Sequence, residues 1–85
     1  MTQETLALHA GHPEGHEGYV LLLYRPDSEG RVRWREWSSD DYVGPPREGS
    51  SSVEEIVDRV VQWGREGWSL NESVHRVTAW LAAAP

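Results

Sequence analysis

The chain has 85 residues, which is the length of one small domain, and we assign residues 1–85 to a single domain. It contains no cysteine, and all 8 of its basic residues are arginine, so disulfides, thiolate metal sites and lysine or cysteine chemistry are excluded. Its formal net charge of −6 argues against general nucleic-acid binding, because such proteins need a basic face to displace counterions from phosphates.

The distribution of apolar residues predicts a protein without a membrane contact. The longest apolar run, residues 19–24, is far shorter than the roughly 20 residues that a membrane-spanning helix needs. The N-terminal residues have neither the basic start nor the apolar stretch of a signal peptide. We therefore expect a cytoplasmic protein, and the use of arginine in place of lysine suits a GC-rich bacterial genome.

The N-terminal segment has the least defined pattern in the chain. Residues 5–9 alternate weakly between polar and apolar side chains, which is compatible with an edge strand. Glycines and a proline between positions 11 and 18 then interrupt any regular element. We interpret residues 1–17 as a loop or a flexible N-terminal segment.

Residues 19–37 predict a β-hairpin. A β-branched, aromatic and aliphatic run at 19–25 is bounded by Gly18 and a proline. In residues 31–37 the side chains alternate, with Val32 and Trp34 on one face and the arginines on the other. The turn between them carries proline, aspartate and glycine. A five-residue loop would place Tyr24 beside Val32 and Leu22 beside Trp34. A shift of one residue would instead place the arginines over Leu22 and Tyr24.

The C-terminal half predicts a linker followed by two helices. Residues 38–51 are rich in serine, glycine and proline, and the prolines exclude a central strand. The first helix is expected to begin at the serines, with either Ser51 or Ser52 in a capping box, and to stop by residue 67. Residues 70–82 carry a helical apolar stripe and predict a second helix, with a further strand as the competing interpretation.

Strands followed by helices indicate an α+β fold. We predict a small antiparallel β-hairpin, or a three-stranded sheet, packed against two C-terminal helices. The expected core consists of apolar residues from all of these elements: Leu22, Tyr24, Val32, Trp34, Val53, Ile56, Val57, Val60, Leu70, Val74, Val77 and Leu81.

The first strand of the hairpin is apolar on both faces, which predicts an interface. Two helices cover only one face of a narrow sheet, so Tyr19, Leu21 and Leu23 are expected to remain exposed on the other face. A large exposed apolar patch usually marks a binding surface. We therefore expect a homodimer through the sheet or a permanent protein partner.

Three arginines and a tryptophan share one face of the second strand: Arg31, Arg33, Arg35 and Trp37. Arginine beside tryptophan is typical of protein-interface hot spots and also of phosphate contact with base stacking. A purely structural interpretation is that these arginines pair with carboxylates of residues 40–58 or lie over aromatic rings. Three charges are too few, against −6 overall, for tight nonspecific DNA binding, so we do not expect a nucleic-acid partner.

The N-terminal histidines His9, His12 and His16 lie near two glutamates and are the candidate metal ligands of this chain. Their spacing matches no metal motif, and glycine and proline leave the ligands without preorganisation. We therefore interpret the segment as a solvated loop and predict no metal or cofactor.

The sequence shows no catalytic constellation, since it has no nucleophile elbow and no phosphate-binding glycine loop. The leading hypothesis is a small non-enzymatic accessory or regulatory protein that binds another protein. The alternatives are an acidic nucleic-acid mimic that inhibits a DNA- or RNA-binding protein, and a metal-binding protein that uses the N-terminal histidines.

Overall fold

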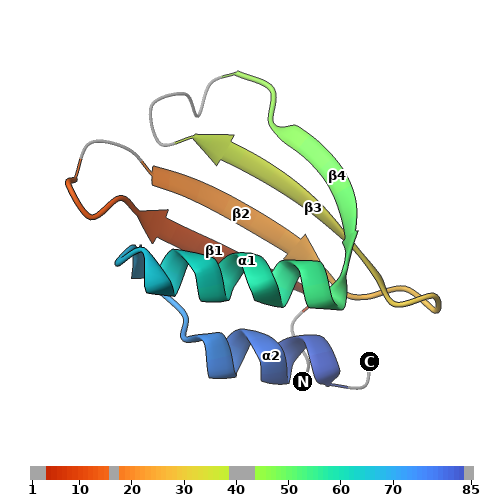
Figure 1. Cartoon of the computed structure of the whole chain (residues 1–85). Helices are drawn as coiled ribbons and strands as arrows, with labels where there is room; N and C mark the ends of the chain where they lie inside the picture. Colours follow the sequence, from red (N-terminus) through yellow and green to blue (C-terminus); the bar gives the residue numbers. More distant parts are fainter. Residues whose placement is uncertain (1–3, 16–17, 39–43, 84–85) are drawn as a thin grey trace.

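The computed structural model describes residues 4–15, 18–38 and 44–83, which form a five-stranded antiparallel sheet and two helices. In chain order the elements are β1 (Thr5–Gly11), β2 (Gly18–Tyr24), β3 (Arg31–Ser38), β4 (Arg47–Ser52), α1 (Val53–Arg65), β5 (Ser69–Leu70) and α2 (Val74–Ala82). The spatial order of strands is β4-β3-β2-β1-β5. Both helices lie on one side of the sheet (Figure 1). The α+β class is confirmed, but the sheet is larger than the predicted hairpin or three strands.

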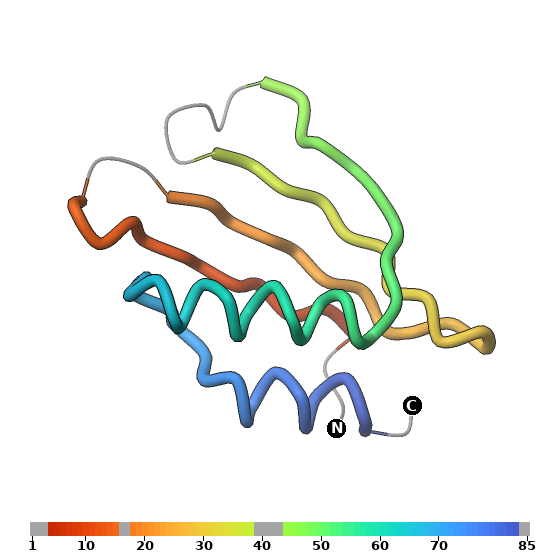
Figure 2. The backbone as a smooth tube through the Cα atoms, in the orientation of Figure 1, coloured from red at the N-terminus to blue at the C-terminus, as the bar shows by residue number. Residues whose placement is uncertain are grey.

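The sheet gains its extra strands at both edges of the predicted hairpin. Residues 5–11 form β1 and pair along the whole of β2, so the interpretation of residues 1–17 as a loop or flexible segment is wrong for this stretch. The strand that the alternation at 5–9 allowed is present, but it lies between β2 and β5 instead of at an edge. Residues 47–51, predicted as part of a linker, instead belong to β4, which pairs with β3 and passes directly into α1 (Figure 2). β4 is an edge strand, in agreement with the expectation that the prolines before it exclude a central one.

The hairpin between β2 and β3 forms with the shifted register. Leu23 lies opposite Trp34 and Leu22 opposite Arg35, so the expected pairing of Tyr24 with Val32 is wrong and the alternative is found. The turn is held by Asp27, whose carboxylate accepts the backbone N–H groups of Glu29 and Arg31, both at 2.9 Å. The Arg31 backbone hydrogen bond lowers the pKa of Asp27 below its ordinary value.

The core lies between the sheet and the helices. Leu6 and Leu8 of β1 sit opposite Leu23 and Leu21 of β2, and all four face the helices. The other buried apolar residues are Ala10, Val32, Ile56, Val60, Trp63, Val77, Trp80 and Leu81. Leu22 and Tyr24, which were expected here, point to the opposite side. The prediction was wrong because β2 is apolar on both faces, so its sequence alone does not decide which face is buried.

Both helices begin at serines. Ser52 caps α1 in a capping box with Glu55: the Ser52 hydroxyl accepts the Glu55 N–H at 3.1 Å, and a Glu55 carboxylate oxygen accepts the Ser52 N–H at 2.9 Å. The helix ends at Arg65, as expected. The second helix starts at Val74 rather than 70, because Ser73 caps it while Ser69 and Leu70 pair with β1. Within the described residues, neither helix has the length and apolar content needed to cross a bilayer.

Candidate functional site

The side of the sheet that faces away from the helices is not covered by any described element (Figure 1). We call this surface the open face. The strand registers place on it alternate residues of β1 to β4: Ala7, His9, Val20, Leu22, Tyr24, Arg31, Arg33, Arg35, Trp37, Glu48 and Ser50. Its apolar centre comes from Val20, Leu22, Tyr24 and Trp37, each of which is partly exposed.

The predicted partner-binding residues divide between the two faces of the sheet. Arg31, Arg33, Arg35 and Trp37 lie on the open face, where the strict alternation of β3 predicted a shared surface. Leu21 and Leu23 are 0% exposed beneath the helices, so their expected exposure is wrong.

Tyr19 also belongs to the helix side of the sheet. Its ring stacks on Trp68 with the centroids 5.8 Å apart, and Trp68 in turn lies 6.0 Å from Trp63. These rings close the end of the core beside the start of β2. The homodimer expected from exposure of Tyr19, Leu21 and Leu23 therefore has no support from these three residues. The exposed apolar surface consists of their sequence neighbours instead.

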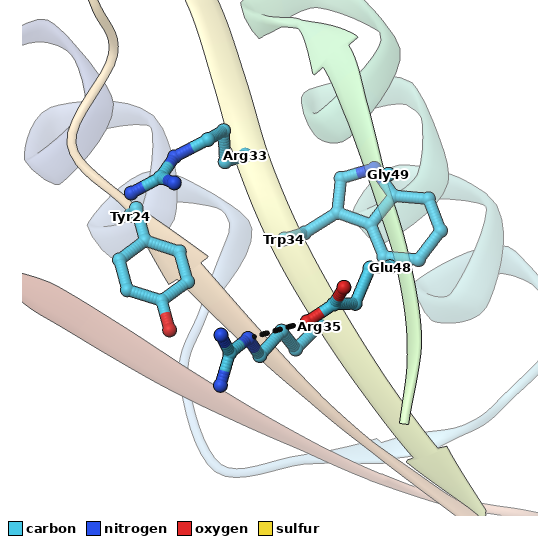
Figure 3. Close-up of a pocket in the computed structure, with 6 residues that line it drawn as sticks. All are labelled: Tyr24, Arg33, Trp34, Arg35, Glu48 and Gly49. Carbon is cyan, nitrogen blue, oxygen red and sulfur yellow. Dashed lines mark ion pairs between the residues drawn. The ribbon is translucent and has the colours of Figure 1, made fainter. Parts of the chain in front are cut away.

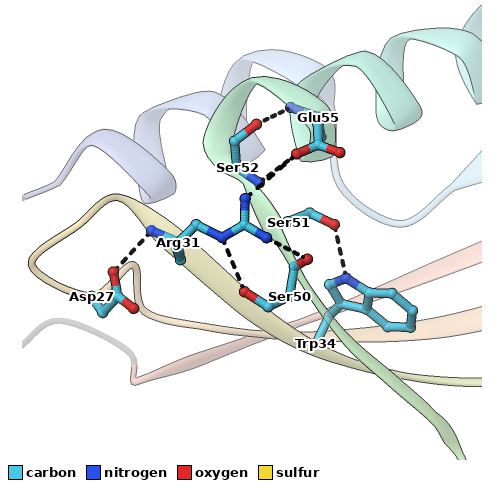
Figure 4. Close-up of polar contacts among 7 residues, drawn as sticks. All are labelled: Asp27, Arg31, Trp34, Ser50, Ser51, Ser52 and Glu55. Atoms are coloured by element: carbon cyan, nitrogen blue, oxygen red, sulfur yellow. Dashed lines mark hydrogen bonds and ion pairs between the residues drawn. The ribbon is translucent and has the colours of Figure 1, made fainter.

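Two of the three open-face arginines are neutralised by the chain itself. Arg35 Nε lies 2.8 Å from a Glu48 carboxylate oxygen on the adjacent strand. Arg31 lies 3.8 Å from Glu55, and it donates to the Ser50 carbonyl oxygen at 2.8 Å and to the Ser50 hydroxyl at 3.3 Å (Figure 4). The capping hydrogen bonds of Ser52, with a smaller contribution from Arg31, lower the pKa of Glu55.

Arg33 differs from these two arginines. Its guanidinium carbon lies 5.0 Å from the centroid of the Tyr24 ring, and no carboxylate within the described residues pairs with it. A pocket of about 170 Å³ lies beside it, lined by Tyr24, Arg33, Trp34, Arg35, Glu48 and Gly49 (Figure 3). Among the described residues, the open face thus carries one arginine without a carboxylate partner, and this arginine lies next to a small recess.

Glu36 is the buried charged residue of the described chain, and it was not among the residues predicted to be functional. Its side chain is 4% exposed and pairs with Arg59 of α1 and, at 3.5 Å, with Arg47 of β4. Arg59 also lies over the Trp63 ring at 4.6 Å. The alternation of β3 was the available signal, because Glu36 has the same phase as the buried Val32. This pair fixes α1 to the sheet, and we assign it a structural role.

The candidate metal ligands do not gather in the described part of the chain. His9 is exposed on β1, and its backbone N–H donates to the Asn71 side-chain oxygen at 2.7 Å. The His12 Nδ1 accepts the Glu14 N–H at 3.1 Å, and its ring meets Trp68 edge-on at 4.9 Å. His16 lies outside the described residues. Among those described, no three histidine, aspartate or glutamate side chains form a group that could hold a metal ion.

The alternative function of an acidic nucleic-acid mimic depends on where the carboxylates lie. The described ones are spread over both ends of β1, the β2–β3 turn, β3, β4, α1 and the segments after α1 and before α2. Several are already paired with arginines: Glu36, Glu48, Glu55 and Glu72. This distribution does not favour a continuous acidic surface.

Comparison of the chain with protein-family models, with curated proteins and with solved structures finds no match.

Proposed function

We propose that this protein is a small non-enzymatic accessory or regulatory protein of the cytoplasm that binds another protein through its open face. One observation carries the proposal: Val20, Leu22, Tyr24 and Trp37 are partly exposed on a sheet face that no described element covers. Contiguous apolar surface on a folded protein is costly to leave in water and usually marks an interaction site.

The residue types of this surface support a protein interface. Tyrosine, tryptophan and arginine are the side chains most enriched in interface hot spots, because each buries a large area while keeping a polar group for orientation. Tyr24 and Trp37 occupy adjacent strands with Arg33 and Arg35 beside them. Adjacent strands are about 4.8 Å apart, so four strands provide a rigid platform about 15 Å across. The side chains on this platform therefore lose little conformational freedom when a partner binds.

The proposal is tested by affinity capture with one variant on the open face and one control variant on the helices. The wild type, Leu22→Asn and His75→Ala are each immobilised and incubated with a lysate of the native host. The proteins that each one retains are identified by mass spectrometry and compared. Leu22 is on the open face, whereas His75 is exposed on α2. We expect a protein that is retained by the wild type and by His75→Ala and lost with Leu22→Asn.

Circular dichroism of each variant checks that the fold is kept. Equal retention of every captured protein by Leu22→Asn would contradict the proposal. Loss with His75→Ala alone would move the binding surface to the helices. A second copy of the chain as the retained species would identify the open face as a homodimer interface.

A further inference from the structure

We infer that the partner presents an acidic side chain to the open face, and that the pocket between Tyr24, Arg33 and Arg35 receives its carboxylate. This inference rests on the proposed function, and it names the chemistry of the bound segment: an aspartate or glutamate flanked by apolar residues.

Arg33 is available to bind a carboxylate, because its charge is not compensated within the described residues. Arg31 and Arg35 face carboxylates of the same chain at 3.8 and 2.8 Å, whereas Arg33 has none within the described residues. A guanidinium in water interacts weakly, but a carboxylate brought to it in a covered interface forms a charge-assisted pair with two parallel hydrogen bonds. Arg33 thus gains a partner only when something covers the open face.

The surroundings of Arg33 hold its guanidinium in place. The guanidinium carbon of Arg33 lies 5.0 Å from the centroid of the Tyr24 ring, and this contact restricts the rotamers of the arginine. Figure 3 shows Arg33, Tyr24 and Arg35 on the same side of β3, around the recess. A volume of about 170 Å³ accommodates one acidic side-chain end together with water.

The acidic residue that lines the pocket, Glu48, does not reverse this preference. Its carboxylate is paired with Arg35 Nε at 2.8 Å, so these two charges cancel and Arg33 sets the local sign. The Arg35–Glu48 ion pair does weaken anion binding at the pocket, because Arg35 is already bound to Glu48. Removal of the Glu48 charge is therefore expected to strengthen anion binding.

The presence of one unpaired arginine among the described open-face residues favours a protein carboxylate over a nucleic-acid backbone as the ligand. Affinity for DNA or RNA grows with the number of phosphates neutralised, and one free guanidinium neutralises about one. The net charge of −6 repels a polyanion at long range. A single acidic side chain needs only one cationic partner, and the apolar residues beside it can cover Val20, Leu22 and Trp37.

The experiment uses two capped peptides as probes, Ac-Leu-Glu-Leu-NH2 and its neutral counterpart Ac-Leu-Gln-Leu-NH2. Each is titrated into the ¹⁵N-labelled full chain, and backbone amide and arginine Nε–Hε signals are followed by NMR. We expect the acidic peptide to shift the Arg33 Nε–Hε signal and the amides of residues 33–35 and 48–50. Its affinity should exceed that of the neutral peptide by about three- to ten-fold, the range for an ion pair that is partly covered.

Three variants make the assignment specific. Arg33→Gln should abolish the difference between the two peptides, whereas Arg65→Gln, which removes the same charge from the exposed end of α1, should preserve it. Glu48→Gln should raise the affinity for the acidic peptide by about two- to five-fold, because it releases Arg35. A gain of affinity is not produced by partial unfolding.

The outcomes separate this inference from the proposed function. Equal binding of both peptides at the open face would overturn the acidic preference and leave an apolar protein-binding surface. Failure of the acidic peptide to shift the open-face signals would also overturn it, and the capture experiment would then decide the function independently. Open-face shifts that depend on protein concentration without peptide would show a second copy as the occupant instead.

Discussion

The contact of Trp34 with Gly49 shows how one missing side chain shapes β4. The two residues lie opposite each other in the β3–β4 pair, and the Trp34 indole reaches across the neighbouring strand. A Cβ atom on Gly49 would lie 2.3 Å from Cζ2 of that ring. The indole Nε1–H donates to the Ser51 hydroxyl at 3.1 Å, which fixes the ring in this position. Trp34 therefore provides the apolar cover that the side chains of β4 lack.

Replacement of Gly49 by alanine should destabilise the fold by about 1–3 kcal/mol, the usual cost of forcing a group into occupied space. Gly64→Ala is the matched control, because Gly64 lies within α1 and has nothing within 4 Å of an added Cβ. That substitution should stabilise the protein by about 0.5–1 kcal/mol through the higher helix propensity of alanine. Urea unfolding followed by tryptophan fluorescence measures both. Equal stability of Gly49→Ala and the wild type would show that the Trp34 ring is not held over β4.

At the scale of the elements, the two edges of the sheet are protected in different ways. Beside β1, the short strand β5 pairs with Ala10 and Gly11 only. Asn71 extends this cover: its side chain donates to the Ala7 carbonyl at 3.0 Å and accepts the His9 N–H at 2.7 Å. An amide side chain thus replaces the backbone of a longer strand.

The β4 edge is protected by a side chain from the strand behind it. The backbone groups of Arg31 bond to Asp27, so they point toward β2 and away from β4. In an antiparallel pair, two opposed residues either bond to each other or both point away from each other. Ser52 lies opposite Arg31, and Ser50 is two residues before Ser52, so the peptide groups of both serines point outward to the edge. Glu55 accepts the Ser52 N–H, and Arg31 crosses β4 to donate to the Ser50 carbonyl (Figure 4). Arg31 therefore blocks part of an otherwise open strand edge.

Arg31→Ala is expected to increase self-association, because it exposes the Ser50 carbonyl to strand pairing with another chain. Sedimentation velocity over a concentration series compares it with the wild type and with Arg65→Ala. Both substitutions make the net charge more negative by one, so electrostatic repulsion changes equally. A larger sedimentation coefficient for Arg31→Ala alone is the expected result. Indistinguishable behaviour of the two variants would mean that the β4 edge does not pair even when Arg31 is absent.

At the scale of the whole molecule, the sequence predicted the elements better than their assembly. The β2–β3 hairpin, the capping of α1 by a serine and its end before residue 67 follow from local signals that are strong in this chain. β4 was missed because residues 47–52 contain no apolar side chain, and the strand forms only because β3 offers a free edge and Trp34 covers Gly49. Its existence depends on a tertiary contact that no local pattern encodes.

The candidate site was predicted in part for a related reason. In β3 Arg31, Arg33 and Arg35 alternate with Val32 and Trp34, so one face could be assigned to the arginines, and Trp37 to the same face, from sequence. In β2 both alternating sets are apolar. The choice between them is made by β1, which places Leu6 and Leu8 opposite Leu23 and Leu21 on the helix side. Because the pairing of β1 with β2 was not part of the prediction, the buried and the exposed residues of β2 were exchanged.

The adjacent leucines of β2 therefore provide a test of the whole arrangement. Leu21 is 0% exposed, so Leu21→Ala should cost about 2–5 kcal/mol of stability by leaving a cavity. Leu22 is partly exposed on the open face, so Leu22→Ala should cost about 1 kcal/mol or less and instead weaken binding of the captured partner. Chemical denaturation and the capture assay measure the two effects separately. Because the substitutions are chemically identical and one position apart, only the direction of the side chain can distinguish them. The reverse order of stabilities would place the other face of β2 against the helices and remove the open face as the binding surface.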